Sequence, residues 1–225
     1  DQAGLTVKEE TIDDAVAAVA LLRQTEGVDP QRVFVLGHSL GGMVAPRIAE
    51  AAPEIAGLIV LAGATRPLED LTIEQLEYIA SLPGEHSQAE MDKIAQMKAE
   101  AERVKASDLS DDPEDGKLLF GAPASYWRDL RAYRPTETAA KLTLPMLILQ
   151  GGRDYQVTEV DLENWRQALA GHDNVTLKLY PNLNHLFAEG GGKATPKEYE
   201  KLQHVAPQVI EDVAGWVGEQ KPPAR

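Results

Sequence analysis

Hydrophobic positions along the chain follow two spacings, one typical of amphipathic helices and one typical of buried strands. The helical spacing predicts helices at residues 11–25, 37–52 and 158–170, and a last helix with Val209, Ile210, Val213, Trp216 and Val217 on one side. Short apolar runs predict strands at residues 32–37, 57–63, 144–151 and 175–180. The first two runs are apolar throughout, which is typical of parallel strands buried on both faces. Alternating strands and helices predict an α/β fold with a parallel sheet flanked by helices.

Between residues 66 and 140 the pattern changes. Helical segments dominate there, with an acidic turn at residues 107–116, and no buried strand is predicted. This stretch therefore reads as a helical insertion. The expected organisation is one core formed by residues 1–65 and 141–225, with residues 66–140 inserted as a cap.

Composition excludes several classes of protein. The chain has 225 residues and a formal charge of −14, which argues against nucleic acid or an anionic membrane as partner. No apolar run approaches the roughly 18 residues that a membrane span needs, so we expect no membrane span. The N-terminus lacks the apolar segment of a signal peptide, so we expect no signal peptide either. The absence of cysteine excludes disulfides, thiolate metal sites and a cysteine nucleophile.

Residues 37–41, GHSLG, match the pattern G-x-S-x-G between a predicted strand and a predicted helix. In that context a sharp turn would hold Ser39 in a strained conformation, with its hydroxyl at the carboxyl edge of the sheet. We expect the glycines on either side to let strand and helix pass closely. The backbone N–H of Leu40, at the helix N-terminus, could bind a developing oxyanion.

A nucleophilic serine needs a base and an orienting acid. Asp154 directly follows the third predicted strand, and His185 follows the fourth by a few residues. Both would lie at the same edge of a parallel sheet as Ser39, in the chain order serine, aspartate, histidine. The sequence thus predicts the triad Ser39, Asp154 and His185. A few residues after Asp154, Thr158 and Asp161 are predicted to cap the helix over residues 158–170.

The other histidines suggest no further chemistry. His38 is expected to pack, and His86, His172 and His204 are expected at the surface. No two-histidine ligand spacing occurs, so we expect no metal and no cofactor.

The chain resembles the α/β-hydrolase superfamily, and within it bacterial serine esterases with a helical cap. The resemblance rests on GHSLGGMVAPRIA, SYWRDLRAY, LPMLILQGGRDYQV and YPNLNHLF, which are spread over most of the chain. It implies hydrolysis of a small-molecule ester through an acyl-enzyme, with a small to medium acyl chain. It also makes Tyr126 and Trp127 candidates for an apolar acyl pocket, although packing of the cap on the core explains them equally well.

One departure from the superfamily is large. Its sheet has eight strands with the nucleophile strand fifth, whereas only a helix precedes Ser39 here. The strand at residues 32–37 would then lie at an open edge, and the loop that supplies the second oxyanion N–H has no counterpart. We therefore hypothesise that the chain is the C-terminal part of a longer hydrolase, with an N-terminal segment as its partner.

Two alternatives to ester hydrolysis stay open. A peptidase or an acyltransferase could use the same three residues, because the surroundings of a triad decide the acceptor. The chain could also be a non-catalytic module that retains them.

Overall fold

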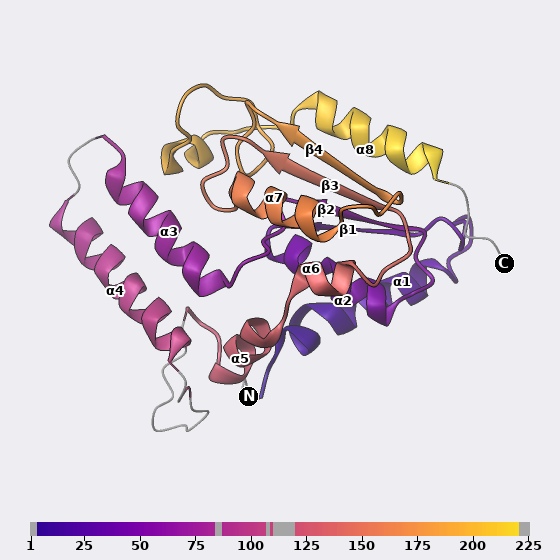
Figure 1. Cartoon of the computed structure of the whole chain (residues 1–225), viewed down its shortest axis with the longest axis horizontal. Helices are drawn as coiled ribbons and strands as arrows, with labels where there is room; N and C mark the ends of the chain where they lie inside the picture. The colour runs from indigo at the N-terminus through magenta and orange to yellow at the C-terminus, as the bar shows by residue number, and fades with distance from the viewer. Residues whose placement is uncertain (1–3, 84–86, 107–108, 110–119, 221–225) are drawn as a thin grey trace.

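The computed structural model describes residues 4–83, 87–106, 109 and 120–220. Its strands are β1 (Phe34–His38), β2 (Gly57–Leu61), β3 (Met146–Gly151) and β4 (Val175–Tyr180). The helices are α1 (Asp13–Leu22), α2 (Leu40–Ala51), α3 (Leu68–Ser81), α4 (Gln88–Lys105), α5 (Ala124–Ala132), α6 (Pro135–Ala139), α7 (Glu159–Ala168) and α8 (Pro207–Glu219). A short π-helical segment, η1 (Lys8–Ile12), leads into α1, and a 3₁₀ segment, η2 (Pro196–Glu200), precedes α8 (Figure 1).

The four strands form one parallel sheet in the order β1-β2-β3-β4. In register, Leu36 lies opposite Ile59, Ile59 opposite Leu147, and Leu147 opposite Thr176. All four predicted strands are present, and the predicted α/β class is confirmed. Because the strands are parallel, the loops that follow them meet at one edge of the sheet.

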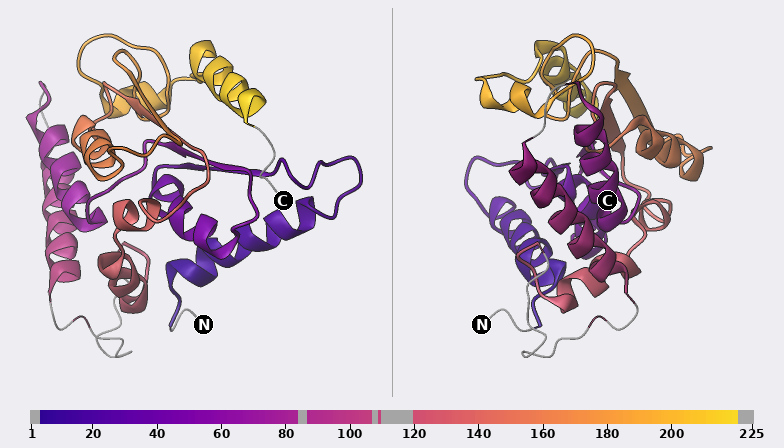
Figure 2. Two further views of the ribbon diagram at one scale, coloured as in Figure 1. Left: turned by 45° about the vertical axis from the view of Figure 1, so that its right-hand side comes forward. Right: turned by 90° about the vertical axis from the view of Figure 1, so that its left-hand side faces the viewer.

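Helices cover both faces of the sheet. Leu58 and Ile148 belong to a buried cluster with Trp165 of α7, on the face that α2, α6 and α7 cover. Alternate residues such as Ile59 belong to the cluster that includes Val209 of α8. The left view in Figure 2 shows the yellow α8 on one side of the sheet and the indigo α1 and purple α2 on the other.

Strand β1 forms an edge of the sheet, as the sequence predicted. Within the described residues no strand pairs with its outer edge. The side chain of Leu36 is 51% exposed, whereas Leu58 and Ile59 of β2 are buried. The expectation that β1 is buried on both faces is therefore wrong, because Leu36 stays half exposed on the face of the sheet that it shares with the buried Ile59.

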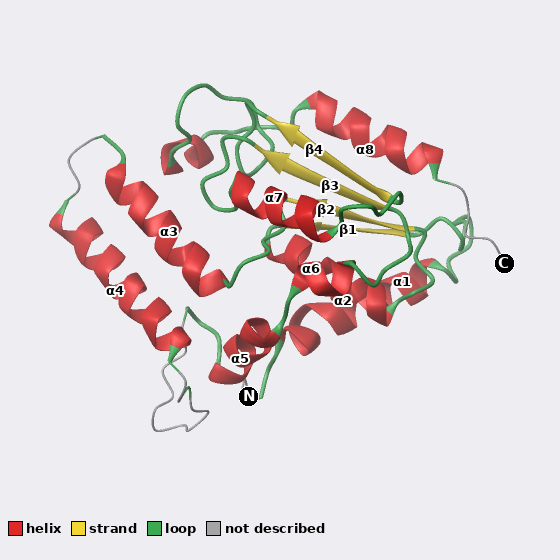
Figure 3. Cartoon of the chain, viewed as in Figure 1, coloured by secondary structure: helices red, strands yellow, loops and turns green. Residues whose placement is uncertain are grey.

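The described part of residues 66–140 forms α3, α4, α5 and α6 and contributes no strand to the sheet (Figure 3). Helices α3 and α4 pack side by side, beyond the end of the sheet toward which the strands point. Helix α6 instead packs on α2 and α7. The acidic turn at residues 107–116 lies outside the described residues, apart from Leu109. No helix in the described ranges is long and apolar enough to cross a bilayer.

Several local predictions were wrong. The first helix begins with η1, before residue 11, and ends at Leu22. Ile210 is 58% exposed and does not share the buried side of α8 with Val209. Thr158 precedes α7 but makes no capping hydrogen bond through its side chain. Asp161 is fully buried and bonds to another segment of the chain, so it is not a cap.

Candidate active site at the carboxyl edge of the sheet

Ser39 lies in the sharp turn between β1 and α2. Its φ of 56° and ψ of −119° are unfavourable for a residue with a side chain. The turn is held by the Ser39 N–H, which donates to the Leu61 carbonyl over 2.9 Å, and by the Ser39 carbonyl, which accepts from Met43 over 2.9 Å. Helix α2 starts at Leu40, so the N-terminus of this helix adjoins the serine. The strained turn expected from the sequence is present.

Two glycines let α2 pack closely at this turn, one against β1 and the other against the segment that follows β2. A Cβ atom on Gly37 would lie 2.2 Å from the carbonyl oxygen of Gly41, and one on Gly42 would lie 2.9 Å from the Cα of Gly63. A Cβ atom on Gly41 would meet nothing within 4 Å. The expectation that both flanking glycines of the motif are needed for close passage is therefore correct for Gly37 only. The second essential glycine is Gly42.

Asp154 and His185 form a buried acid–base pair. Asp154 follows β3 and His185 follows β4, and their side chains are joined by a contact of 2.7 Å between His185 Nδ1 and Asp154 Oδ2. The two residues are only 6% and 4% exposed. The prediction that the ends of these strands bring the two residues together is confirmed.

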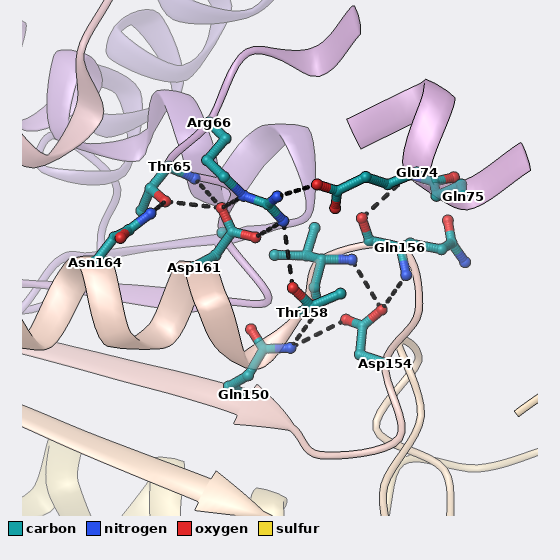
Figure 4. Close-up of polar contacts among 12 residues, drawn as sticks. Thr65, Arg66, Glu74, Gln75, Gln150, Asp154, Gln156, Thr158, Asp161 and Asn164 are labelled. Carbon is teal, nitrogen blue, oxygen red and sulfur yellow. Dashed lines mark hydrogen bonds and ion pairs between the residues drawn. The ribbon is translucent and has the colours of Figure 1, made fainter. Parts of the chain in front are cut away.

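The carboxylate of Asp154 is held on both oxygens. Oδ1 accepts from the backbone N–H groups of Gln156, over 2.8 Å, and Val157, over 3.0 Å. Oδ2 accepts from Gln150 Nε2 over 3.2 Å (Figure 4). Gln150 is buried in β3 and also donates to the Val157 carbonyl over 2.7 Å. Sequence reasoning missed Gln150, although a single amide in the apolar run LPMLILQ is a signal that its polar group must be bonded inside.

The loop that carries His185 is fixed by the preceding residue. Asn184 is fully buried, and its Oδ1 accepts from the N–H groups of Leu186 (3.0 Å) and Ala188 (3.1 Å). Its Nδ2 donates over 3.2 Å to Glu198. Asn184 was also missed from the sequence, because its role depends on side-chain direction within an irregular loop.

Glu198 of η2 connects the loop that carries Asp154 to the loop that carries His185. Its carboxylate accepts from Asn184, the neighbour of His185, and from Arg153, the neighbour of Asp154, at 2.5 Å. Burial acts to raise the pKa of Glu198, but the hydrogen bonds from Arg153 and Asn184 outweigh it and the pKa is lowered. The charged form of Glu198 therefore holds both loops together.

His38 joins the turn that carries Ser39 to the loop that carries His185. Its Nε2 lies 2.8 Å from the carbonyl oxygen of His185, and the two imidazole rings lie 4.6 Å apart between centroids. Burial lowers the pKa of His38 despite the hydrogen bond to that carbonyl, which acts to raise it. The imidazole of His38 thus packs against that of His185, in line with the packing role predicted for His38.

A largely apolar cavity of about 370 Å³ opens beside His38. Its wall comes from the ends of β1 and β2, from the loop after His185, and from the segment before α8. The lining residues are His38, Leu61, Leu186, Phe187, Ala188, Gln203, His204 and Val205.

The two candidates for an acyl pocket lie elsewhere. Tyr126 and Trp127 of α5 are 7% and 6% exposed and belong to the buried cluster that includes Met43 of α2. The Tyr126 hydroxyl donates to Glu10 over 2.9 Å. Neither ring lines the cavity beside His38. This arrangement fits the packing alternative, and a substrate role for the two rings stays a prediction.

Of the two remaining histidines that the structure describes, His204 lines the cavity beside His38 and His172 does not. His204 is exposed, His172 is partly exposed, and His86 lies outside the described residues. In the ranges that the structure describes, no three of the His, Asp and Glu side chains gather as a metal site would require.

Known proteins resemble this chain in both sequence and fold. A family model described as serine aminopeptidase, S33, matches residues 4–189. Esterase EstD of Thermotoga maritima is 42% identical over 217 residues, which cover 96% of this chain and 50% of that protein. The chain thus spans about half the length of this curated relative.

Solved esterases have a similar fold. Est1E from Butyrivibrio proteoclasticus, with ferulic acid bound, gives a TM-score of 0.58 at 20% identity over 96% of this chain and 69% of that one. An esterase of Pyrococcus furiosus gives a TM-score of 0.55 at 18% identity, over 94% of this chain and 62% of that one. An acetyl xylan esterase from Paenibacillus sp. R4 gives a TM-score of 0.55 at 16% identity, over 95% of this chain and 53% of that one. At these identities the likeness shows the fold alone.

Proposed function

The chain belongs to the serine aminopeptidase S33 family of α/β-hydrolases, and from this premise we propose that it carries the catalytic residues of a serine carboxylesterase. The observation that carries the proposal is the buried contact of 2.7 Å between Asp154 and His185, at the edge of the sheet where the strained turn presents Ser39. A nucleophile, a base and an orienting acid at one edge suit acyl transfer.

In the proposed reaction, Ser39 Oγ attacks the ester carbonyl and His185 Nε2 takes the hydroxyl proton. Asp154 holds Nδ1 of the imidazole and stabilises the cation that forms. The tetrahedral oxyanion accepts a hydrogen bond from the Leu40 N–H at the start of α2. The imidazolium then protonates the leaving alcohol, which leaves an acyl-enzyme that water hydrolyses by the same steps.

The cavity beside His38 is our candidate for the acyl site. Its volume of about 370 Å³ and its apolar wall suit a small to medium acyl chain. Narrowing it with Leu186→Trp should shift the preference toward shorter acyl chains. If Tyr126 and Trp127 form the acyl pocket instead, Trp127→Leu should change the chain-length preference and Leu186→Trp should not.

The proposed enzyme has two further parts. Residues 66–140 would form its cap. A strand from an N-terminal segment of the same hydrolase would pair with the free edge of β1, which accounts for the 51% exposure of Leu36 and for the share of EstD that this chain spans. That segment would supply the second oxyanion donor, whose absence lowers the rate by about a hundred- to a thousandfold.

Release of p-nitrophenol from short-chain esters tests the function. We expect hydrolysis by the chain, its loss in Ser39→Ala, and its retention in Ser87→Ala, which changes an exposed serine that caps α4. A fluorophosphonate probe should label the wild type and not Ser39→Ala. Labelling without turnover would indicate an intact nucleophile that lacks the rest of its oxyanion hole. Absence of labelling would favour the non-catalytic alternative.

Peptide hydrolysis is the second candidate, because the matching family model is described as a serine aminopeptidase. An aminoacyl p-nitroanilide separates the two activities, since it presents an amide bond whose cleavage releases the coloured p-nitroaniline. Faster Ser39-dependent cleavage of the anilide than of the ester would overturn the esterase proposal and establish a peptidase.

A further inference from the structure

The two residues that follow Asp154 both contact α3. Gln75 Nε2 donates to the Gln156 carbonyl over 3.1 Å. The ring of Tyr78 stacks on the ring of Tyr155, with centroids 4.8 Å apart and planes inclined by 3°. Gln75 and Tyr78 stand three positions apart and so share one face of the helix. This face of α3 lies along the turn that carries the acid.

The hydrogen bonds of Gln156 connect α3 directly to the carboxylate. Its N–H donates to Asp154 Oδ1 over 2.8 Å, while its carbonyl accepts from Gln75 (Figure 4). A shift of α3 would therefore move the residue that holds one oxygen of the acid.

Tyr78 reaches a second loop of the site. Its hydroxyl donates over 2.7 Å to the carbonyl of Ala194, a buried residue in the segment after His185. One side chain thus contacts the turn of Asp154 through its ring and the segment after His185 through its hydroxyl.

The segment that leads into α3 is anchored to α7, the helix after the acid turn. Arg66 Nη2 donates to the buried Asp161 over 2.9 Å, and its Nη1 donates to Glu74 of α3 over 2.5 Å. Asp161 also accepts from the backbone and the hydroxyl of Thr65 (Figure 4). The segment before α3 and the middle of α3 are therefore both bonded to residues 154–161.

We propose that Gln75 and Tyr78 are positioning residues that hold Asp154 in line with His185, so that α3 takes part in catalysis as well as covering the site. This inference rests on the proposed triad. Because small displacements of catalytic groups lower rates steeply, loosening this contact should reduce kcat by about ten- to a hundredfold and leave KM nearly unchanged.

The experiment compares Gln75→Leu, Tyr78→Phe and the double variant with Gln96→Leu, whose exposed amide pairs with Glu100 on α4. Steady-state kinetics on a p-nitrophenyl ester give kcat and KM. Hydrogen exchange at the Gln156 and Val157 amides, both donors to the acid, is measured without substrate. We expect lower kcat, unchanged KM and faster exchange at these two amides in the double variant, with the control like the wild type.

Unchanged exchange at both amides would overturn the proposal whatever the activity. A rise in KM at constant kcat would also overturn it, because the two side chains would then act on substrate binding. If the wild type shows no Ser39-dependent hydrolysis, the proposed function fails, and the exchange measurement still decides whether α3 holds the acid turn.

Discussion

Substitution of Asp161 tests how residues 66–140 are attached to the core. The Asp161 side chain is fully buried, and its donors within the described residues come from the segment that leads into α3. They are the Thr65 N–H at 2.8 Å, the Thr65 hydroxyl at 2.7 Å, and Arg66 Nη2 and Nε at 2.9 and 3.3 Å. Asp161→Asn keeps the shape, but it removes the charge and turns an NH₂ group toward at least one of these donors.

The expected loss of stability follows from the charge of Arg66, which loses its buried partner in this variant. Removing one partner of a buried ion pair costs about 3–5 kcal/mol, because the other charge stays buried without compensation. The side chain of Arg66 is 20% exposed and keeps Glu74 as a partner, which places the loss at the lower end of that range. A destabilisation of about 3 kcal/mol lowers the melting temperature of a domain this size by about 6–12 °C.

Urea unfolding followed by circular dichroism measures this loss. Asp173→Asn is the matched control, since Asp173 is exposed. We expect the control to stay within about 0.5 kcal/mol of the wild type. A loss below about 1 kcal/mol for Asp161→Asn would refute the reasoning, because it would mean that water or the remaining bonds already compensate the Arg66 charge.

Three further predictions concern the site. Asp154→Asn should lower kcat by about 10⁴-fold with little change in KM, as expected for a triad acid. The control Asp173→Asn should leave kcat unchanged. A loss of kcat under tenfold in Asp154→Asn would show that Asp154 is not the acid of the triad. Glu198→Gln should lower kcat about tenfold by loosening both loops, whereas the exposed Glu200→Gln should have no effect in the same ester assay. Burial lowers the pKa of His38 below its ordinary value of 6.5, so its contribution to stability is complete above pH 6.5 and is lost as the pH falls toward the lowered value. Urea unfolding at a series of pH values should therefore show a shallower acid slope for His38→Gln than for the wild type, and equal slopes would contradict this.

Local signals in the sequence predicted the elements and the position of the candidate site. The apolar runs predicted all four strands, because strands buried in a parallel sheet are apolar at consecutive positions. The turn around Ser39 was recognisable because a strained strand-to-helix turn needs a particular local sequence. That Asp154 and His185 meet followed from parallel strand order alone.

The support around those residues was not predictable, because it joins segments that are distant in sequence. Asp161 read as a helix cap, and only the folded chain brings Arg66 to it across 95 positions. Glu198 looks like any exposed acid in the sequence, yet it binds the neighbours of both Asp154 and His185.

The sequence by itself thus determined the α/β class, the strands and the placement of Ser39, Asp154 and His185 at one edge of the sheet. Only the tertiary structure decided that Glu198 connects the two loops, that Arg66 binds Asp161 and that α3 lies against the acid turn. The physical reason is that hydrophobic periodicity and turn chemistry act over a few neighbouring residues. The pairing of buried polar groups depends instead on which distant side chains are brought together and removed from water.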